Sequence, residues 1–142
     1  EGPVRTNFDD LNTYEVTRQG SKVAVLALGD FYDLGEKTVE ALSSTLGIEA
    51  TLVKPYFASG VDQNLLDNLV KDHNVIVTIE DGIIEGGWGQ NIASYLGTSS
   101  VRVLNYGVKK AFYDRVNVAE LMRESHLEPE LIAEDVKQVL GL

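Results

Sequence analysis

The sequence has no cysteine among its 142 residues. It therefore forms no disulfide and offers no thiolate as a nucleophile or metal ligand. Its longest apolar runs, such as residues 23–28, are far too short to span a bilayer. No charged segment followed by an apolar stretch indicates a signal peptide. These absences are typical of a cytoplasmic protein, and we expect this location.

Basic residues are also scarce. The chain has 12 Lys and Arg against 22 Asp and Glu, which gives a formal net charge of -10. Such a field repels the phosphates of nucleic acids and the surface of anionic membranes. We therefore expect neither as a partner, whereas a basic protein surface would suit the charge.

Methionine occurs only once, at Met122, and the sequence begins at Glu1. Because a primary translation product begins with methionine, we expect a processed chain or a piece of a larger protein. The length suits one domain. Residues 1–20 are polar and irregular and are predicted to be an N-terminal arm or the end of a linker. Residues 21–142 are predicted to form a single α/β domain.

Hydrophobic periodicity predicts alternating strands and helices. Strands are expected at 22–28, 48–53, 75–79 and 101–104, with a further short one at 14–17. Helices are expected at 33–46, after Asp62, and at 88–96, 119–124 and 130–140. Asp33 and Asp62 are predicted to cap their helices, and Gly47 to end the first. This order predicts a three-layer α/β/α fold with a mostly parallel sheet of about five strands.

The residues indicate no catalytic, cofactor-binding or metal-binding group. The only histidines, His73 and His126, lie in polar segments and are predicted to be surface residues of turns. Neither accompanies a nucleophile motif, and they lack the spacing of a metal-binding pair. Acidic pairs such as Glu134-Asp135 lack the pattern of a calcium loop.

The most unusual segment, residues 80–90, is rich in glycine and joins a strand to a helix. Ligands gather at this edge of parallel sheets, and a helix N-terminus favours an anion. However, the spacing matches no complete phosphate-binding motif, and the segment contains acidic residues but no basic one. A bound phosphate, a turn that docks on another protein surface and a plain loop all remain open. The candidate interface residues of this segment are Glu80, Asp81, Gly82, Gly86, Gly87, Trp88 and Gly89.

Aromatic side chains offer two further candidate contacts. Trp88 has apolar residues four and five positions later, which predicts a core position; an anchor in an interface is the alternative. Tyr56 and Phe57 could lie in an interface or simply cover the edge of the sheet.

An ordered set of motifs resembles the C-terminal domain of the transketolase superfamily, most of all its 1-deoxy-D-xylulose-5-phosphate synthase branch. The resemblance covers about residues 20 to 140. It is carried by residues 23–31, 47–52, 60–62, Val77-Thr78-Ile79-Glu80-Asp81-Gly82, Gly86-Gly87-Trp88-Gly89-Gln90, 103–107 and 121–132.

The resemblance implies a role within a larger enzyme. Full-length members have three domains, of which the first two bind thiamine diphosphate and its Mg²⁺ and supply the catalytic glutamate. The third packs against the others, supports the dimer and carries none of the principal cofactor ligands. The implied reaction joins pyruvate and glyceraldehyde 3-phosphate and releases carbon dioxide, a step towards isoprenoid precursors. This chain is accordingly expected to be an inactive scaffold whose partners are other domains or subunits, with a homodimer possible.

Two other functions remain open at this point. The chain could be a stand-alone regulatory domain that binds a nucleotide or sugar phosphate at residues 80–89. It could also be a docking module of a complex like the 2-oxo-acid dehydrogenases.

Overall fold

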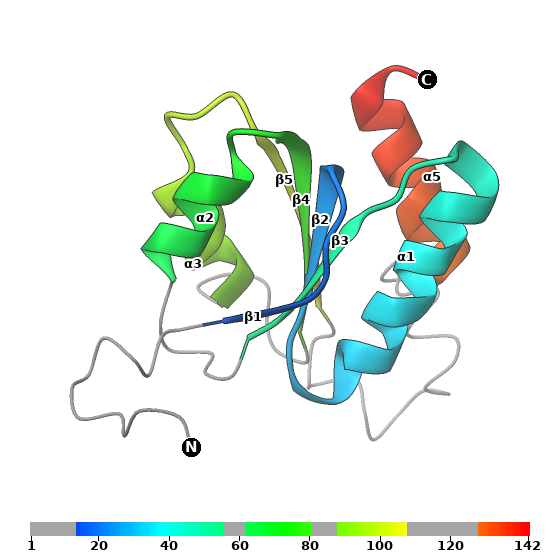
Figure 1. The fold of residues 1–142 in the computed structure, drawn as a ribbon, viewed down its shortest axis with the longest axis horizontal. Helices are drawn as coiled ribbons and strands as arrows, with labels where there is room; N and C mark the ends of the chain where they lie inside the picture. Colours follow the sequence, from blue (N-terminus) through cyan, green and yellow to red (C-terminus); the bar gives the residue numbers. More distant parts are fainter. Residues whose placement is uncertain (1–13, 56–61, 81–87, 108–127) are drawn as a thin grey trace.

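The computed structural model describes residues 14–55, 62–80, 88–107 and 128–142 (Figure 1). The strands are β1 (Glu15–Arg18), β2 (Lys22–Ala27), β3 (Thr51–Lys54), β4 (His73–Glu80) and β5 (Arg102–Gly107). The helices are the 3-10 turn η2 (Gly29–Phe31), α1 (Tyr32–Leu46), α2 (Gln63–Leu69), α3 (Trp88–Tyr95) and α5 (Pro129–Leu140). The helix expected at 119–124 and His126 lie outside the described residues.

The five strands form one sheet in the order β1-β3-β2-β4-β5. Neighbours among β2 to β5 are parallel, and β1 runs antiparallel to β3 at one edge. The β1 strand therefore brings residues 15–18 into the sheet. The predicted mostly parallel sheet of about five strands is confirmed.

Among the described residues, two helices cover each face of the sheet. In Figure 1, α1 and α5 lie on one side of the strands, and α2 and α3 lie on the other. The central strand β2 is buried on both faces, because Val23, Val25 and Ala27 pack under α1 while Ala24 and Leu26 pack under the opposite layer. This arrangement confirms the predicted three-layer α/β/α fold. Among the helices that the structure describes, none has the length and apolar character needed to cross a membrane.

The start of α1 differs from the prediction. Asp33 was expected to cap this helix, but the helix begins one residue earlier and its N-cap position, Phe31, makes no side-chain cap bond. The 3-10 turn leads directly into α1, so the amide of Tyr32 already donates to the carbonyl of Gly29. The predicted end is confirmed: Gly47 adopts φ 69°, a left-handed conformation that glycine accepts without strain.

Strand boundaries shift for identifiable reasons. The strand expected at 48–53 begins only at Thr51, because the amide of Ile48 still bonds the Leu42 carbonyl at the end of α1. The β4 strand starts at His73 rather than Val75, since His73 already pairs with Lys22 of β2. At its other end β4 runs to Glu80. The Glu80 carboxylate therefore lies at the carboxyl ends of the parallel strands, next to the start of α3.

Candidate functional site

The glycine-rich candidate segment begins where β4 ends and finishes where α3 begins. Of the residues singled out as a candidate interface, the structure describes Glu80, Trp88 and Gly89. The others lie outside the described residues: Tyr56, Phe57, Asp81, Gly82, Gly86 and Gly87. The described residues therefore define the two ends of this segment.

Glu80 binds the start of α3 with both carboxylate oxygens. Its Oε1 accepts the Trp88 amide at 3.2 Å, and its Oε2 accepts the Gly89 amide at 2.7 Å. The side chain is only 5% exposed. A helix N-terminus has free N–H groups and a partial positive charge, so a buried carboxylate is well matched to it. Glu80 thus joins the end of β4 to the start of α3.

This contact changes the interpretation of the segment as an anion site. From the sequence alone, Glu80 is expected to repel a phosphate. In the structure, the Glu80 carboxylate occupies the amides that a phosphate at a helix N-terminus would use. The first two amides of α3 are therefore bonded by an anion that belongs to the chain itself.

Gly89 lies in close contact with polar groups of the sheet. A Cβ atom at this position would meet Thr78 Oγ1, would lie 2.8 Å from Asn105 Oδ1 and would lie 2.9 Å from Glu80 Oε2. The Thr78 hydroxyl also donates to Asn105 Oδ1 at 2.6 Å and joins β4 to β5. Only glycine allows α3 to approach the strands this closely.

Trp88 lies in the core on the α2 and α3 side of the sheet and is 2% exposed, so its predicted core position is confirmed. Its indole N–H donates to the Tyr14 hydroxyl at 3.0 Å. The two rings meet edge to face, with centroids 6.3 Å apart and an interplanar angle of 66°. This geometry is favoured for aromatic pairs.

Tyr14 in turn contacts the start of α2. Its amide donates to Asp62 Oδ2 at 2.8 Å, while Asp62 Oδ1 accepts the Leu65 amide at 3.1 Å. The predicted N-cap role of Asp62 is therefore confirmed, and the same carboxylate binds a second segment of the chain. Burial raises the pKa of the Tyr14 hydroxyl, which stays protonated and available for hydrogen bonding.

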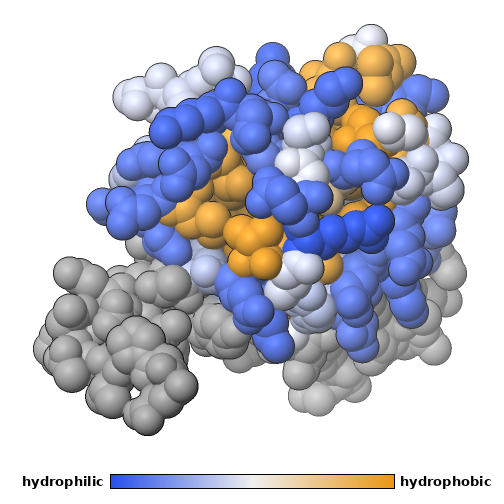
Figure 2. All heavy atoms as spheres, in the orientation of Figure 1, coloured by the Kyte–Doolittle hydropathy of each residue, from blue (hydrophilic) through white to orange (hydrophobic). Residues whose placement is uncertain are grey.

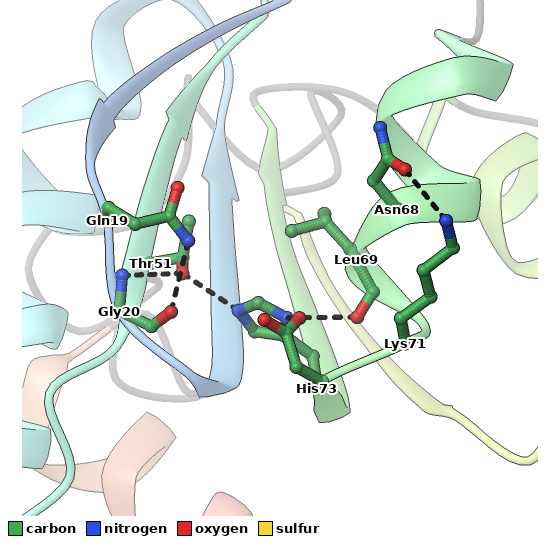
Figure 3. Close-up of polar contacts among 8 residues, drawn as sticks. Gln19, Gly20, Thr51, Asn68, Leu69, Lys71 and His73 are labelled. Carbon is green, nitrogen blue, oxygen red and sulfur yellow. Dashed lines mark hydrogen bonds and ion pairs between the residues drawn. The ribbon is translucent and has the colours of Figure 1, made fainter.

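A second polar cluster lies at the opposite end of β3 and β4 (Figure 3). His73 was predicted to be a surface residue of a turn, and this prediction is wrong: the side chain is only 4% exposed. Its Nε2 lies 2.8 Å from Thr51 Oγ1, and its Nδ1 lies 2.9 Å from the Leu69 carbonyl and 2.6 Å from Asp72 Oδ1. Thr51 also accepts the Gly20 amide at 2.9 Å. The imidazole is buried because partners from β3 and α2 surround it.

One face of the described surface is mainly hydrophilic. Figure 2 shows one face on which polar residues surround smaller apolar patches. A depression of about 530 Å³ lies between α1 and α5 and is open to solvent. Charged residues of both signs line it, including Lys37, Glu40 and Glu130. Within the described ranges, no group of three or more His, Cys, Asp or Glu side chains is placed to hold a metal ion.

The chain is therefore a three-layer α/β/α domain. Its sheet is parallel except for one antiparallel edge strand, and helices cover both faces. The family model for the C-terminal domain of transketolase matches residues 12–132. The chain belongs to the transketolase C-terminal domain family.

Curated relatives include two 1-deoxy-D-xylulose-5-phosphate synthases. The protein of Pseudoalteromonas translucida (strain TAC 125) is 33% identical over 97% of this chain. That of Vibrio vulnificus (strain CMCP6) is 30% identical over 98% of the chain. In each case the match covers 22% of the relative, so this chain spans about a fifth of the length of these proteins.

Solved structures share the fold. A split-gene transketolase, in an inactive β4 tetramer, matches with a TM-score of 0.77 and 23% identity over 98% of this chain and 44% of that chain. A transketolase from Pichia stipitis matches with a TM-score of 0.59 and 17% identity over 90% of this chain and 18% of that chain. At these identities the likeness concerns the fold.

Proposed function

We propose that this chain is the non-catalytic C-terminal scaffold domain of a thiamine-diphosphate-dependent enzyme, namely a 1-deoxy-D-xylulose-5-phosphate synthase. The complete enzyme would join pyruvate to glyceraldehyde 3-phosphate in the cytoplasm. Its other domains would hold thiamine diphosphate and Mg²⁺. This chain, residues 21–142 together with the β1 edge strand, would contribute contacts to those domains and support for a homodimer.

The main support for this proposal is the hydrogen bonding at the carboxyl edge of the sheet. In α/β proteins this edge is the usual place for a ligand. Here the most suitable anion-binding feature, the start of α3, bonds the buried carboxylate of Glu80. The described polar groups at the two ends of the glycine-rich segment are therefore used to fix the local structure, which suits a scaffold better than a binding pocket.

The similar proteins support the proposal that the enzyme is a 1-deoxy-D-xylulose-5-phosphate synthase. The relatives at 33% and 30% identity are 1-deoxy-D-xylulose-5-phosphate synthases, and this chain corresponds to about a fifth of each. A split-gene transketolase shares the fold, and the matching region makes up 44% of that chain. Both an excised domain and a separately encoded subunit are compatible with the proposed role.

A direct test compares the isolated chain with a fusion. Isothermal calorimetry of the 142-residue chain with thiamine diphosphate and Mg²⁺ should give no heat of binding. In the fusion, the chain replaces the matching C-terminal region of the Pseudoalteromonas translucida synthase. Pyruvate consumption should be present in the fusion and absent both from the isolated chain and from the synthase truncated without replacement. Micromolar cofactor binding by the isolated chain, or a fusion no more active than the truncation, would contradict the proposal.

The alternative of a regulatory nucleotide domain makes the opposite prediction. A ligand that binds the folded chain raises its melting temperature by mass action. Because Glu80 already bonds the Trp88 and Gly89 amides, we expect nucleotides and sugar phosphates to leave the melting temperature unchanged. A reproducible, concentration-dependent rise with one of them would favour the regulatory function.

A further inference from the structure

Four residues at the carboxyl edge of the sheet form a continuous path of polar contacts. Glu80 binds the Trp88 amide, the Trp88 indole binds the Tyr14 hydroxyl, and the Tyr14 amide binds Asp62. Asp62 completes the path by capping α2 through Leu65. Figure 1 shows the end of β4 and the starts of α2 and α3 at the same edge of the domain. We call Tyr14, Asp62, Glu80 and Trp88 the edge network.

The contacts of the edge network are of kinds that fix the orientation of Tyr14 relative to α2 and α3. Both carboxylates accept backbone amides, and charge-assisted hydrogen bonds are stronger than neutral ones. The link between them is an edge-to-face aromatic pair with a hydrogen bond, and both rings are buried: Tyr14 is 6% exposed and Trp88 is 2% exposed. In a buried environment, a bonded polar group that loses its partner is costly, so the links favour one arrangement.

The position of Tyr14 connects the edge network to the place where the chain enters the sheet. Tyr14 directly precedes β1, the edge strand whose four side chains are all exposed. Core burial of these side chains therefore contributes little to holding the strand. Its start is instead held by the backbone and the hydroxyl of Tyr14, which reach α2 and α3 across 48 and 74 positions of sequence. The path of the chain into the sheet is thus tied to the two helices that cover one face.

We propose that Tyr14 and Trp88 are positioning residues: they fix the direction in which the polypeptide enters this domain and so orient the α2 and α3 face relative to the remaining domains of the enzyme. The proposal rests on the function proposed above. Its partner is the preceding part of the same enzyme, because the edge network joins the chain before β1 to the body of the domain. Tyr14 and the starts of α2 and α3 then present one rigid edge to that partner.

The competing explanation is that the pair only adds stability to the core. Tyr14→Phe separates the two explanations, since it keeps the ring and removes the acceptor of the Trp88 indole. Tyr106→Phe is the matched control. Tyr106 is equally buried, at 6% exposure, and its hydroxyl donates to Asp135 at 2.7 Å, but this contact joins β5 to α5 on the other side of the sheet.

The first measurement uses the isolated 142-residue chain and asks whether the edge network is coupled. Amide hydrogen exchange should become about fivefold faster at Leu65, Trp88 and Gly89 in Tyr14→Phe, the factor expected for one net hydrogen bond. Tyr106→Phe should leave these three amides unchanged relative to the rest of the chain. Equal acceleration in both variants would mean that the hydroxyl of Tyr14 acts only on global stability, and the proposal would be wrong.

The second measurement uses the fusion with the Pseudoalteromonas translucida synthase and asks whether the coupling affects assembly. At a temperature where both variants are folded, pyruvate turnover should fall by about fivefold or more with Tyr14→Phe and stay near that of the unmodified fusion with Tyr106→Phe. An active fusion in which both variants behave alike would overturn the positioning role while leaving the scaffold function intact. An inactive unmodified fusion would instead count against the scaffold function.

Discussion

The His73 imidazole and the Thr51 hydroxyl form a hydrogen bond that joins the start of β4 to β3. The Leu69 carbonyl near Nδ1 can only accept, so Nδ1 carries the proton in the neutral ring. The Nε2 atom, 2.8 Å from the Thr51 hydroxyl, is then an acceptor, and Thr51 donates to it. The same hydroxyl oxygen accepts the Gly20 amide. One threonine therefore joins the turn before β2, strand β3 and the start of β4.

Removing this hydroxyl should destabilise the protein. Thr51→Val keeps the side-chain volume but leaves the Gly20 amide and the His73 Nε2 without their partner. We expect the free energy of unfolding to fall by about 1–3 kcal/mol, the cost of unsatisfied buried polar groups. Urea denaturation measures this change. Thr45→Val is the control: Thr45 lies at an exposed position of α1 and its hydroxyl bonds the Ala41 carbonyl of the same helix, so the loss should stay below about 0.5 kcal/mol. Equal effects would show that the Thr51 contacts carry no net stability.

The wrong prediction for His73 shows where local sequence reasoning ends. The segment around His73 is polar, as in a surface turn, and nothing in it indicates burial. One of the buried partners of His73, Thr51, lies 22 positions earlier and reaches the ring because β3 and β4 both pair with β2. By contrast, Gly47 and Asp62 were predicted correctly because their partners lie within a few residues. Local signals of this kind identified the helices and strands, while contacts across the sheet escaped them.

Glu80 provides a second test of a buried polar contact. Glu80→Ala removes the acceptor of two α3 amides, and we expect a loss of about 2–4 kcal/mol in unfolding free energy. Glu80→Gln keeps one oxygen acceptor and should lose less. Glu134→Ala, in the exposed face of α5, should change stability by less than about 0.5 kcal/mol. If Glu80→Ala were as mild as Glu134→Ala, the carboxylate would not be needed to hold α3.

Gly89 tests the close approach of α3 to the sheet. In Gly89→Ala, the new methyl group would meet Thr78, Asn105 and Glu80, so the start of α3 must move away from the strands. We expect destabilisation of about 1–3 kcal/mol, as for other overpacked sites, despite the better helix propensity of alanine. The emission of Trp88, the only tryptophan, should shift to longer wavelength as its environment loosens. Unchanged stability and emission would mean that the helix adapts without cost.

The candidate site was only partly predictable. Glycines between a strand and a helix marked the segment, and the apolar spacing after Trp88 predicted its burial. The partner of the indole, Tyr14, lies in a stretch that the sequence suggested was an arm or linker end, and no periodicity connects the two. The role of Glu80 was not predictable either. The sequence pattern of a carboxylate beside glycines is the same whether the carboxylate repels an anionic ligand or takes its place.

Tyr106 makes the stability of the protein depend on pH in a defined direction. Burial, followed by the hydrogen bond to Asp135 and the charge of that carboxylate, raises the pKa of the Tyr106 hydroxyl well above the ordinary value of 10.0. The folded state therefore keeps this proton at a pH where the unfolded state has released it. The resulting stabilisation is complete below the unfolded pKa and is lost as pH rises toward the folded pKa. We expect a decline of about 1.4 kcal/mol per pH unit above roughly pH 10 from this group.

Comparison with Tyr106→Phe isolates this effect from other alkaline titrations. The phenylalanine variant lacks the ionisable group and the bond to Asp135, so near neutral pH it should be less stable by about 1–3 kcal/mol. The difference between the two proteins should then shrink as the pH is raised from about 9 to about 11, since only the parent chain contains this buried phenol. Guanidinium denaturation at several pH values gives the difference directly. A difference that stays constant or grows over this range would mean that the hydroxyl titrates alike in the folded and unfolded states.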